Sequence, residues 1–349
     1  MTQNKKIGIW LLSVALMVMI MTLIGAITRL TESGLSITEW KPITGAIPPI
    51  GEAAWAAEFD KYKATPEFAQ KHFWMTVQDF KQIYFWEWLH RFWGRLIGIA
   101  YAGPLIFFFM RGYIQTKSDR LKLFGLFILG GMQGALGWFM VKSGLVDEPS
   151  VSHYRLAAHL ALALLLYSLL FLQGMAFIRR DKAPLALPRA SCALQIHGII
   201  SLALVCLTIL WGAFTAGLDA GMIYNTFPKM GAGLVPPDMW AHFPKWLNLF
   251  ENHASVQFMH RLLAVLTGLV VLAYAAHGFK FDRKHFGFIG IWVCVQIILG
   301  IGTLMMFGGE NQKAAIHIAA THQFGAVMLL TITLLTLYRI KLSRAKISL

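Results

Sequence analysis

The chain has few charged residues. Asp, Glu, Lys and Arg make up 14% of its 349 residues, against about 25% in a typical soluble domain. Hydrophobic residues make up 57%, and the mean hydropathy is +0.58. A chain of this length could hold two soluble domains by size alone. Its composition excludes that arrangement and indicates an integral membrane protein.

Cysteine is also scarce, and no Cys-x-x-Cys pair occurs among Cys192, Cys206 and Cys294. All three fall in expected helices or at a cytoplasmic helix end, so neither a structural disulfide nor a thiolate metal site is predicted. We interpret them as small apolar filler. The N-terminus lacks an Arg- and Ser-rich presequence and its first apolar run has no small-residue cleavage site. Neither a mitochondrial transit peptide nor a cleaved signal is expected.

In place of charged residues and cysteines, the chain contains long apolar stretches. Eight of them are long enough to cross about 30 Å of hydrocarbon as helices. They cover residues 7–28, 88–110, 121–141, 154–178, 194–216, 254–277, 285–307 and 315–338. The predicted fold class is therefore an all-α integral membrane protein with eight transmembrane helices.

The net charge of +14 could suggest a nucleic-acid partner, but its distribution indicates a membrane. More than half of the basic residues flank helix ends in short segments on one side, from Lys5 and Lys6 to Arg339 and Lys341. This is the positive-inside pattern, which predicts cytoplasmic termini. A bacterial plasma membrane is the simplest location, and no nucleic acid is expected. The aromatic outer segment 50–86 is predicted to form short helices on the membrane surface, as interfacial anchors or a substrate lid.

The second half of the chain repeats the first. Glu87–Gly98 aligns with Gln257–Gly268 at an offset of 170 residues. Three further positions recur at an offset of 163: Gln133 with Gln296, Gly137 with Gly300, and His159 with His322.

These repeats predict two duplicated four-helix bundles related by a pseudo-two-fold axis along the membrane normal. The expected N-terminal repeat is 1–180 and the C-terminal repeat is 194–349, joined by a cytoplasmic linker over 181–193.

Four histidines occupy duplicated positions. Ionisable groups inside membrane helices are costly and usually functional, and imidazole is a common ligand for iron. A single such histidine is more often a satisfied polar core residue, but paired recurrence favours ligands. Each is expected to open an apolar helix on the outer side, so that each half can clamp a haem or metal. The pairs are His90 with His159, and His260 with His322.

The two halves differ beside these histidines. Glu87 stands where the second repeat has Gln257. A carboxylate near a haem can act as a base or stabilise a positive intermediate, or it can form a salt bridge with Arg91. Arg91 and Arg261 directly follow their histidines and can pair with haem propionates or extend to lipid head groups.

The chain resembles the haem A synthase family. The resemblance lies in Gly25–Thr31, Ser33–Ser36 and Glu39–Pro49, and in the motif Glu87-x-x-His90-Arg91 with its three partner histidines. It covers essentially the whole chain. The absence of cysteines from the outer loops resembles the proteobacterial and mitochondrial subclass rather than the subclass with a paired-cysteine loop.

The resemblance implies an oxidoreductase that converts the ring-position-8 methyl of haem O to a formyl group. Successive hydroxylations with water as the oxygen source give haem A for terminal oxidases. It also implies a haem b cofactor on the iron ligands His260 and His322. The substrate haem iron is then expected between His90 and His159, with Glu87 nearby.

Two other functions remain open at this stage. A two-haem cytochrome b-type electron carrier explains paired histidines but not the contrast between Glu87 and Gln257. A transporter predicts matching helix breaks, yet Pro104 has Tyr274 as its counterpart. Because haem O is too apolar for water, direct transfer from haem O synthase is a further hypothesis. The sequence names neither the electron acceptor in the membrane nor the oligomeric state, and a homo-oligomer stays open.

Overall fold

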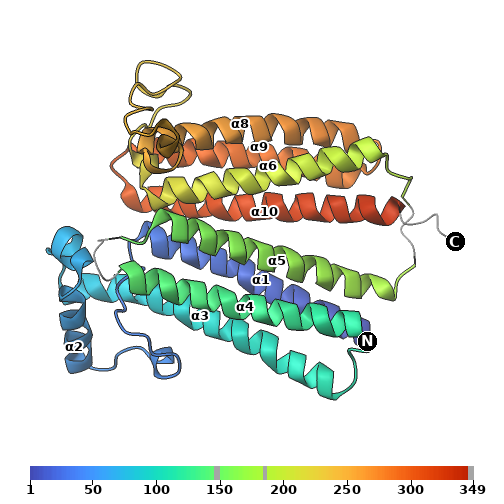
Figure 1. Ribbon diagram of the computed structural model, residues 1–349, viewed down its shortest axis with the longest axis horizontal. Helices are drawn as coiled ribbons and strands as arrows, with labels where there is room; N and C mark the ends of the chain where they lie inside the picture. Colours follow the sequence, from blue (N-terminus) through green and yellow to red (C-terminus); the bar gives the residue numbers. More distant parts are fainter. Residues whose placement is uncertain (145–149, 184–186, 345–349) are drawn as a thin grey trace. The chain divides into compact units, whose positions relative to one another are not determined.

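The computed structural model describes residues 1–144, 150–183 and 187–344 (Figure 1). Eight long apolar helices occur among them, one for each predicted span, so the all-α membrane fold class is confirmed. The only β contact in this described part is an isolated bridge between Met230 and Gly233. The long helices are α1 (Gln3–Leu30), α3 (Val77–Met110), α4 (Lys117–Gly144), α5 (His153–Arg180), α6 (Cys192–Gly217), α8 (His253–Gly278), α9 (Arg283–Phe307) and α10 (Gln312–Arg344).

Short helices occupy the connections at one end of the long helices. They are α2 (Glu52–Lys63), a π-helix (Phe68–His72), α7 (Asn248–Glu251) and three 3-10 turns (Thr44–Ala46, Ala220–Met222 and Lys245–Leu247). The predicted short helices of segment 50–86 are therefore present.

The chain separates into two compact units, Met1–Phe171 and Leu172–Leu349, with the division inside α5. In the N-terminal unit, α1, α3 and α4 run alongside α5, and α2 lies across one end (Figure 1). In the C-terminal unit, α6, α8, α9 and α10 form the second set. The predicted repeats, their linker and their pseudo-two-fold relation stay predictions. Residues 184–186 of that linker lie outside the described residues.

Tryptophan side chains join α1 to α3 in the N-terminal unit. The indole of Trp10 donates to the carbonyl of Ala100 at 2.8 Å, and that of Trp93 donates to Met17 at 2.9 Å. Each buried indole N–H thus finds an acceptor on the neighbouring helix. These bonds fix α1 and α3 in antiparallel register.

Helix α3 is longer than the sequence predicted, because it begins at Val77 rather than near residue 88. A capping box starts it: Thr76 Oγ1 accepts from the Asp79 N–H, and the Asp79 carboxylate accepts from the Thr76 N–H. His90 consequently lies more than three turns inside the helix. The prediction that the four histidines open their helices was wrong, since α5, α8 and α10 also begin six to ten residues before theirs.

The extended start of α3 carries residues 31–76, which we name the outer cap after the side of the membrane on which the sequence predicts them. Phe59 and Tyr62 of α2 are buried against Phe80 and Tyr84 of α3, with the Tyr62 and Phe80 rings stacked at 5.2 Å. Of the aromatic residues expected at the membrane surface, these two instead form a small core. Trp74 keeps 60% of its surface exposed and remains available as an interfacial anchor.

A chain of buried polar groups runs through this cap. The Tyr62 hydroxyl donates to Glu67 at 2.9 Å and contacts Nδ1 of His72 at 2.6 Å. Glu32 contacts Nε2 of His72 at 3.3 Å and accepts from Lys71 at 2.6 Å. Burial raises the pKa of Glu67 from 4.5 to about 7, whereas hydrogen bonding from His72 and Lys71 lowers the pKa of Glu32 to about 2.

We expect the stability of the outer cap to fall as the pH rises from about 4.5 to about 7. Over this window the folded state keeps the Glu67 proton that the unfolded state has lost, and each pH unit costs about 1.4 kcal/mol. Hydrogen exchange of residues 52–72 measures the effect. Glu67→Gln should remove the dependence, whereas the control Glu52→Gln at an exposed site should keep it. An unchanged dependence in Glu67→Gln would contradict this assignment.

Candidate functional site

In the C-terminal unit, each predicted ligand histidine packs against a glycine of the next helix. A Cβ added to Gly212 of α6 would lie 3.0 Å from Cε1 of His260 in α8. A Cβ added to Gly300 of α9 would lie 2.9 Å from Cε1 of His322 in α10. Real Cβ atoms almost never approach another atom as closely as 2.9 Å, and a contact of 3.0 Å is tighter than most. Glycine is therefore the residue that lets each imidazole lie flush against the adjacent helix.

The structure brings His260 and His322 together. Their ring centres are 6.5 Å apart and their planes are inclined at 82°. Two imidazoles bonded to one metal, with metal–nitrogen bonds of about 2 Å, have ring centres roughly 6 to 6.5 Å apart. The spacing fits two axial ligands of one haem iron. The fit is supported by Nδ1 of His260, which is buried with no hydrogen-bond partner within the described part of the chain.

The N-terminal unit makes the same two contacts. A Cβ at Gly25 of α1 would lie 3.4 Å from Nε2 of His90 in α3, and one at Gly137 of α4 would lie 3.1 Å from Cε1 of His159 in α5. All four predicted histidines thus lie against glycines, two in each unit.

Glu87 is held by the outer cap. It is 2% exposed, and its carboxylate accepts from the Ser36 hydroxyl at 2.7 Å and from the Ile37 N–H at 2.6 Å. The other oxygen accepts from Arg91 one turn later. The salt bridge that the sequence left as an alternative is therefore present within α3, and the hydrogen bonds from Ser36 and Ile37 tie the cap to this helix.

Gln257 occupies the corresponding position in α8 and is equally buried. Its amide nitrogen donates to the carbonyls of Tyr224 at 3.0 Å and Gly221 at 3.4 Å. The first half thus presents an acceptor to its outer loop, whereas the second half presents a donor. Each residue matches the polarity of the loop that covers it.

The arginines beside the histidines also bind their outer loops. Arg91 donates to the carbonyls of Ile37 at 2.8 Å and Glu39 at 3.1 Å. Arg261 donates to Tyr224 at 2.6 Å and Thr226 at 2.8 Å.

Only one of these two cations has a carboxylate partner. Arg91 pairs with Glu87, but no ion pair of Arg261 occurs in the part of the chain that the structure describes. Nε of Arg261 is buried there without a hydrogen-bond partner. Arg261 therefore keeps an uncompensated charge and a spare donor.

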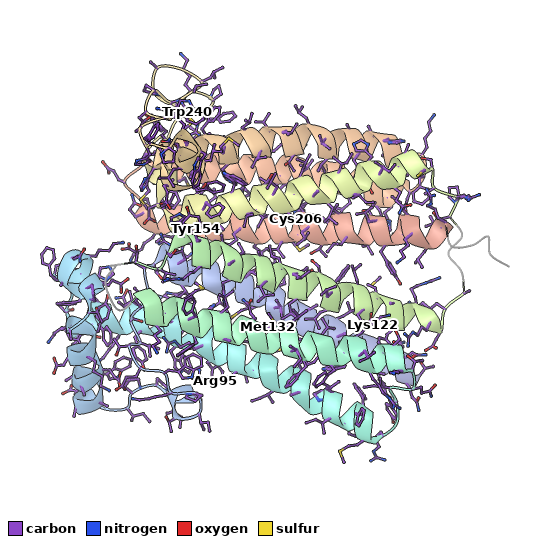
Figure 2. The ribbon with its side chains drawn as sticks, viewed as in Figure 1. Arg95, Lys122, Met132, Tyr154, Cys206 and Trp240 are labelled. Atoms are coloured by element: carbon purple, nitrogen blue, oxygen red, sulfur yellow. The ribbon has the colours of Figure 1, made fainter. Side chains whose placement is uncertain are left out.

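Arg95 was not singled out from the sequence, although it stands one turn after Arg91. It lies beside the first outer loop (Figure 2) and donates to the carbonyls of Pro42 and Lys41, each at 2.8 Å. An arginine one turn from a site residue is only weak evidence of a functional role in the sequence alone. The loop carbonyls that it binds come near it only when the chain folds.

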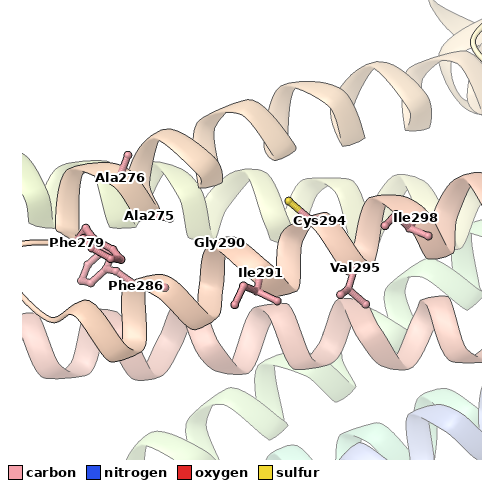
Figure 3. A pocket seen from close by; sticks show the side chains of 10 residues that line it. Ala275, Ala276, Phe279, Phe286, Gly290, Ile291, Cys294, Val295 and Ile298 are labelled. Carbon is pink, nitrogen blue, oxygen red and sulfur yellow. The ribbon is translucent and has the colours of Figure 1, made fainter.

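A groove between α8 and α9 lies on the outside of the C-terminal unit (Figure 3). Apolar side chains such as Phe279, Ile291 and Ile298 line it, with Cys294, and none of its ten lining residues is a histidine. Because none of the four predicted histidines lines it, we do not assign it to the site. Across the described residues, no group of three or more His, Cys, Asp or Glu side chains could hold a metal ion.

Comparison with known proteins adds an independent finding. Residues 8–334 match the family described as cytochrome oxidase assembly protein. The heme A synthase of Rhodospirillum centenum is 48% identical over 342 residues, which cover 97% of this chain and 89% of that protein. The heme A synthase of Parvibaculum lavamentivorans is 42% identical, covering 97% and 95%. That of Wolbachia pipientis is also 42% identical, covering 92% and 89%.

We expect Gly300→Ala to displace the His322 ring and to lower the amount of haem that purifies with the protein. Gly137→Ala should likewise displace His159 and reduce turnover, since a displacement of 1 Å can cost about 10²-fold. Gly134 is the matched control, because a Cβ there meets no atom within 4 Å. Soret absorbance per protein and haem product analysis measure both effects. Equal behaviour of Gly134→Ala and Gly137→Ala would contradict the steric account.

Proposed function

Because this chain belongs to the haem A synthase family, which converts haem O to haem A, we propose that its two histidine pairs divide this work. His260 and His322 hold a resident haem b. His90 and His159 hold the substrate, haem O, while its methyl group is oxidised. The chain is a multi-pass membrane protein with eight apolar helices.

The charge beside each site is the observation that supports this division of labour. Haem propionates are anionic, and arginine binds carboxylates through paired N–H donors. Arg261 donates to loop carbonyls and has a spare buried Nε. Arg91 is already neutralised by Glu87. Arg261 therefore offers an unshared cation to a haem in the C-terminal unit, whereas its counterpart Arg91 in the N-terminal unit is shared with Glu87. Tighter retention suits a cofactor, and weaker retention suits a substrate that must leave.

The residues of the C-terminal unit fit the proposed haem b. The 6.5 Å ring spacing would let both imidazoles bind one iron, and the glycines at 212 and 300 keep the neighbouring helices clear of the rings. Once bound, a haem b supplies a one-electron redox centre within the membrane. The surrounding chain then provides the ligands, the counter-charge at Arg261 and apolar walls.

Glu87 is the proposed catalytic carboxylate of the substrate half. Ser36, Ile37 and Arg91 all donate to it. Its oxygens therefore act as acceptors, and this geometry favours stabilising positive charge over abstracting a proton. By fixing Ser36 and Ile37 it also keeps the outer cap in place over the start of α3, which limits the access of water to the site.

Oxidation of a methyl to a formyl group with water as oxygen source releases four electrons and four protons. The proposed partners follow from this balance and from solubility: an electron acceptor in the membrane, and a haem O synthase that delivers the apolar substrate directly. From the positive-inside pattern we place the chain in a bacterial plasma membrane with cytoplasmic termini. The histidine pairs would then lie towards the outer side. A simple two-haem electron carrier would leave the contrast between Glu87 and Gln257 unexplained.

We expect the two histidine pairs to separate by phenotype. His322→Ala or His260→Ala should remove the b-type spectrum of the purified protein, because a permanent axial ligand is lost. His159→Ala or His90→Ala should keep that spectrum yet abolish haem A formation, measured by chromatography of extracted haems. Loss of haem b from the His90 and His159 variants, with retention in the other two, would reverse the assignment.

The single substitutions Glu87→Gln and Gln257→Glu should each change how firmly its own unit retains haem, in opposite directions. Glu87→Gln leaves Arg91 without its carboxylate, so the N-terminal unit should retain haem O or haem A through purification. Gln257→Glu should neutralise Arg261 and lower haem b content, by about 10-fold if one charge-assisted contact of about 1.4 kcal/mol is lost. Quantified haem extracts of the two variants measure both effects. Unchanged haem content in both would reject the charge-based division of labour.

A further inference from the structure

Two glutamines contact the histidines of α5 and α10, one in each unit. In the C-terminal unit, Nε2 of Gln296 lies 3.0 Å from Nδ1 of His322 and donates to the carbonyl of the same residue at 2.9 Å. In the N-terminal unit, Nε2 of Gln133 lies 3.0 Å from Nε2 of His159 and donates to its carbonyl at 3.1 Å. Each amide therefore fixes both the backbone and the ring of its histidine.

The two contacts engage different ring nitrogens. Gln296 contacts Nδ1 of His322. Gln133 takes Nε2 of His159, and Nδ1 of that ring is buried without a partner in the described part of the chain. Haem iron is commonly ligated by one imidazole nitrogen while the other is held by the protein. The amide thus supports ligation through Nε2 at His322, whereas at His159 it occupies that nitrogen.

An amide suits this place because it can serve a ring nitrogen in either protonation state. Its NH2 group donates to a bare nitrogen, and after rotation its oxygen accepts from a protonated one. The oxygens Oε1 of Gln133 and Gln296 are both buried without partners among the described residues. At Gln296 this oxygen is an acceptor in reserve, available once iron takes Nε2 of His322 and leaves the proton on Nδ1.

Gln296 is also confined more tightly than Gln133. A Cβ at Gly325 of α10 would lie 2.3 Å from Oε1 of Gln296, so the amide lies directly against that backbone. Trp292 contacts the same part of α10, because its indole N–H donates to the Gly325 carbonyl at 2.9 Å. At the 163-residue offset the N-terminal unit has Leu162 in place of Gly325. The close contact between the glutamine amide and a glycine backbone therefore occurs only in the C-terminal unit of this pair of positions.

We propose that Gln296 and Gln133 are positioning residues with opposite effects on haem ligation. Gln296 holds His322 with Nε2 free for the iron of the resident haem. Gln133 competes with the substrate iron for Nε2 of His159 and so keeps that bond exchangeable. This inference rests on the proposed function, because it takes His322 as a cofactor ligand and His159 as a substrate ligand.

The same substitution at both positions tests the inference. Gln296→Met keeps the side-chain length and removes the amide, and it should weaken haem b binding about 10- to 100-fold. Transfer of haem b from the detergent-purified protein to excess apomyoglobin measures that loss, and the electron paramagnetic resonance of the ferric haem should shift. Gln133→Met should leave haem b unchanged. It should instead lower both KM for haem O and kcat, because the iron is held more firmly and product leaves more slowly.

Opposite results would overturn the inference. Haem b affinity within twofold of wild type in Gln296→Met would reject the first role, and a raised KM in Gln133→Met would reject the second. If the Met variants fail to fold, Gln296→Asn and Gln133→Asn keep an amide that is one methylene too short, with the same expected results. His322→Ala distinguishes a failure of this inference from a failure of the proposed function. If it loses haem b while Gln296→Met does not, this inference fails alone; if it retains haem b, the proposed function fails.

Discussion

The site depends on close contact between an imidazole and a glycine of the neighbouring helix. Such a contact occurs four times, and at Gly300 a single methyl group would lie 2.9 Å from the His322 ring. Small residues let membrane helices approach closely. Here the close approach also fixes where a polar ring can point in an apolar interior. The distance between the two rings depends on that constraint. The contact of Gln296 with His322 and the place of Arg261 beside His260 depend on it in turn.

Two sites built on one plan differ in the charge and hydrogen bonding around them. One half pairs its arginine with an acid and binds its outer loop through acceptors at Glu87. The other replaces the acid with Gln257 and leaves Arg261 with backbone partners. Because the histidine and glycine contacts are shared, these neighbours are what can give the two haems different residence times. Under the proposed function, a few polar differences between the two units make one of them a cofactor site and the other a substrate site.

Much of this arrangement could be predicted from the sequence. The eight apolar runs identified every long helix, because crossing hydrocarbon demands about 20 apolar residues in a row. The four histidines and the contrast between Glu87 and Gln257 followed from the internal repeat. The start of α3 at Val77 did not, since a capping box outside the apolar run sets it. The Tyr62–Glu67–His72 network and the Ser36 and Ile37 donors on Glu87 were also missed. They join loop residues to helices, so only the folded loop brings them together.

The central claim is that the C-terminal unit holds a permanent haem and the N-terminal unit a transient one. Electron cryo-microscopy of the purified protein tests it most directly, with maps recorded before and after addition of haem O. The account predicts haem density between His260 and His322 in both maps, and density between His90 and His159 only after the addition. Haem density between His90 and His159 without added haem O, with none between His260 and His322, would contradict it.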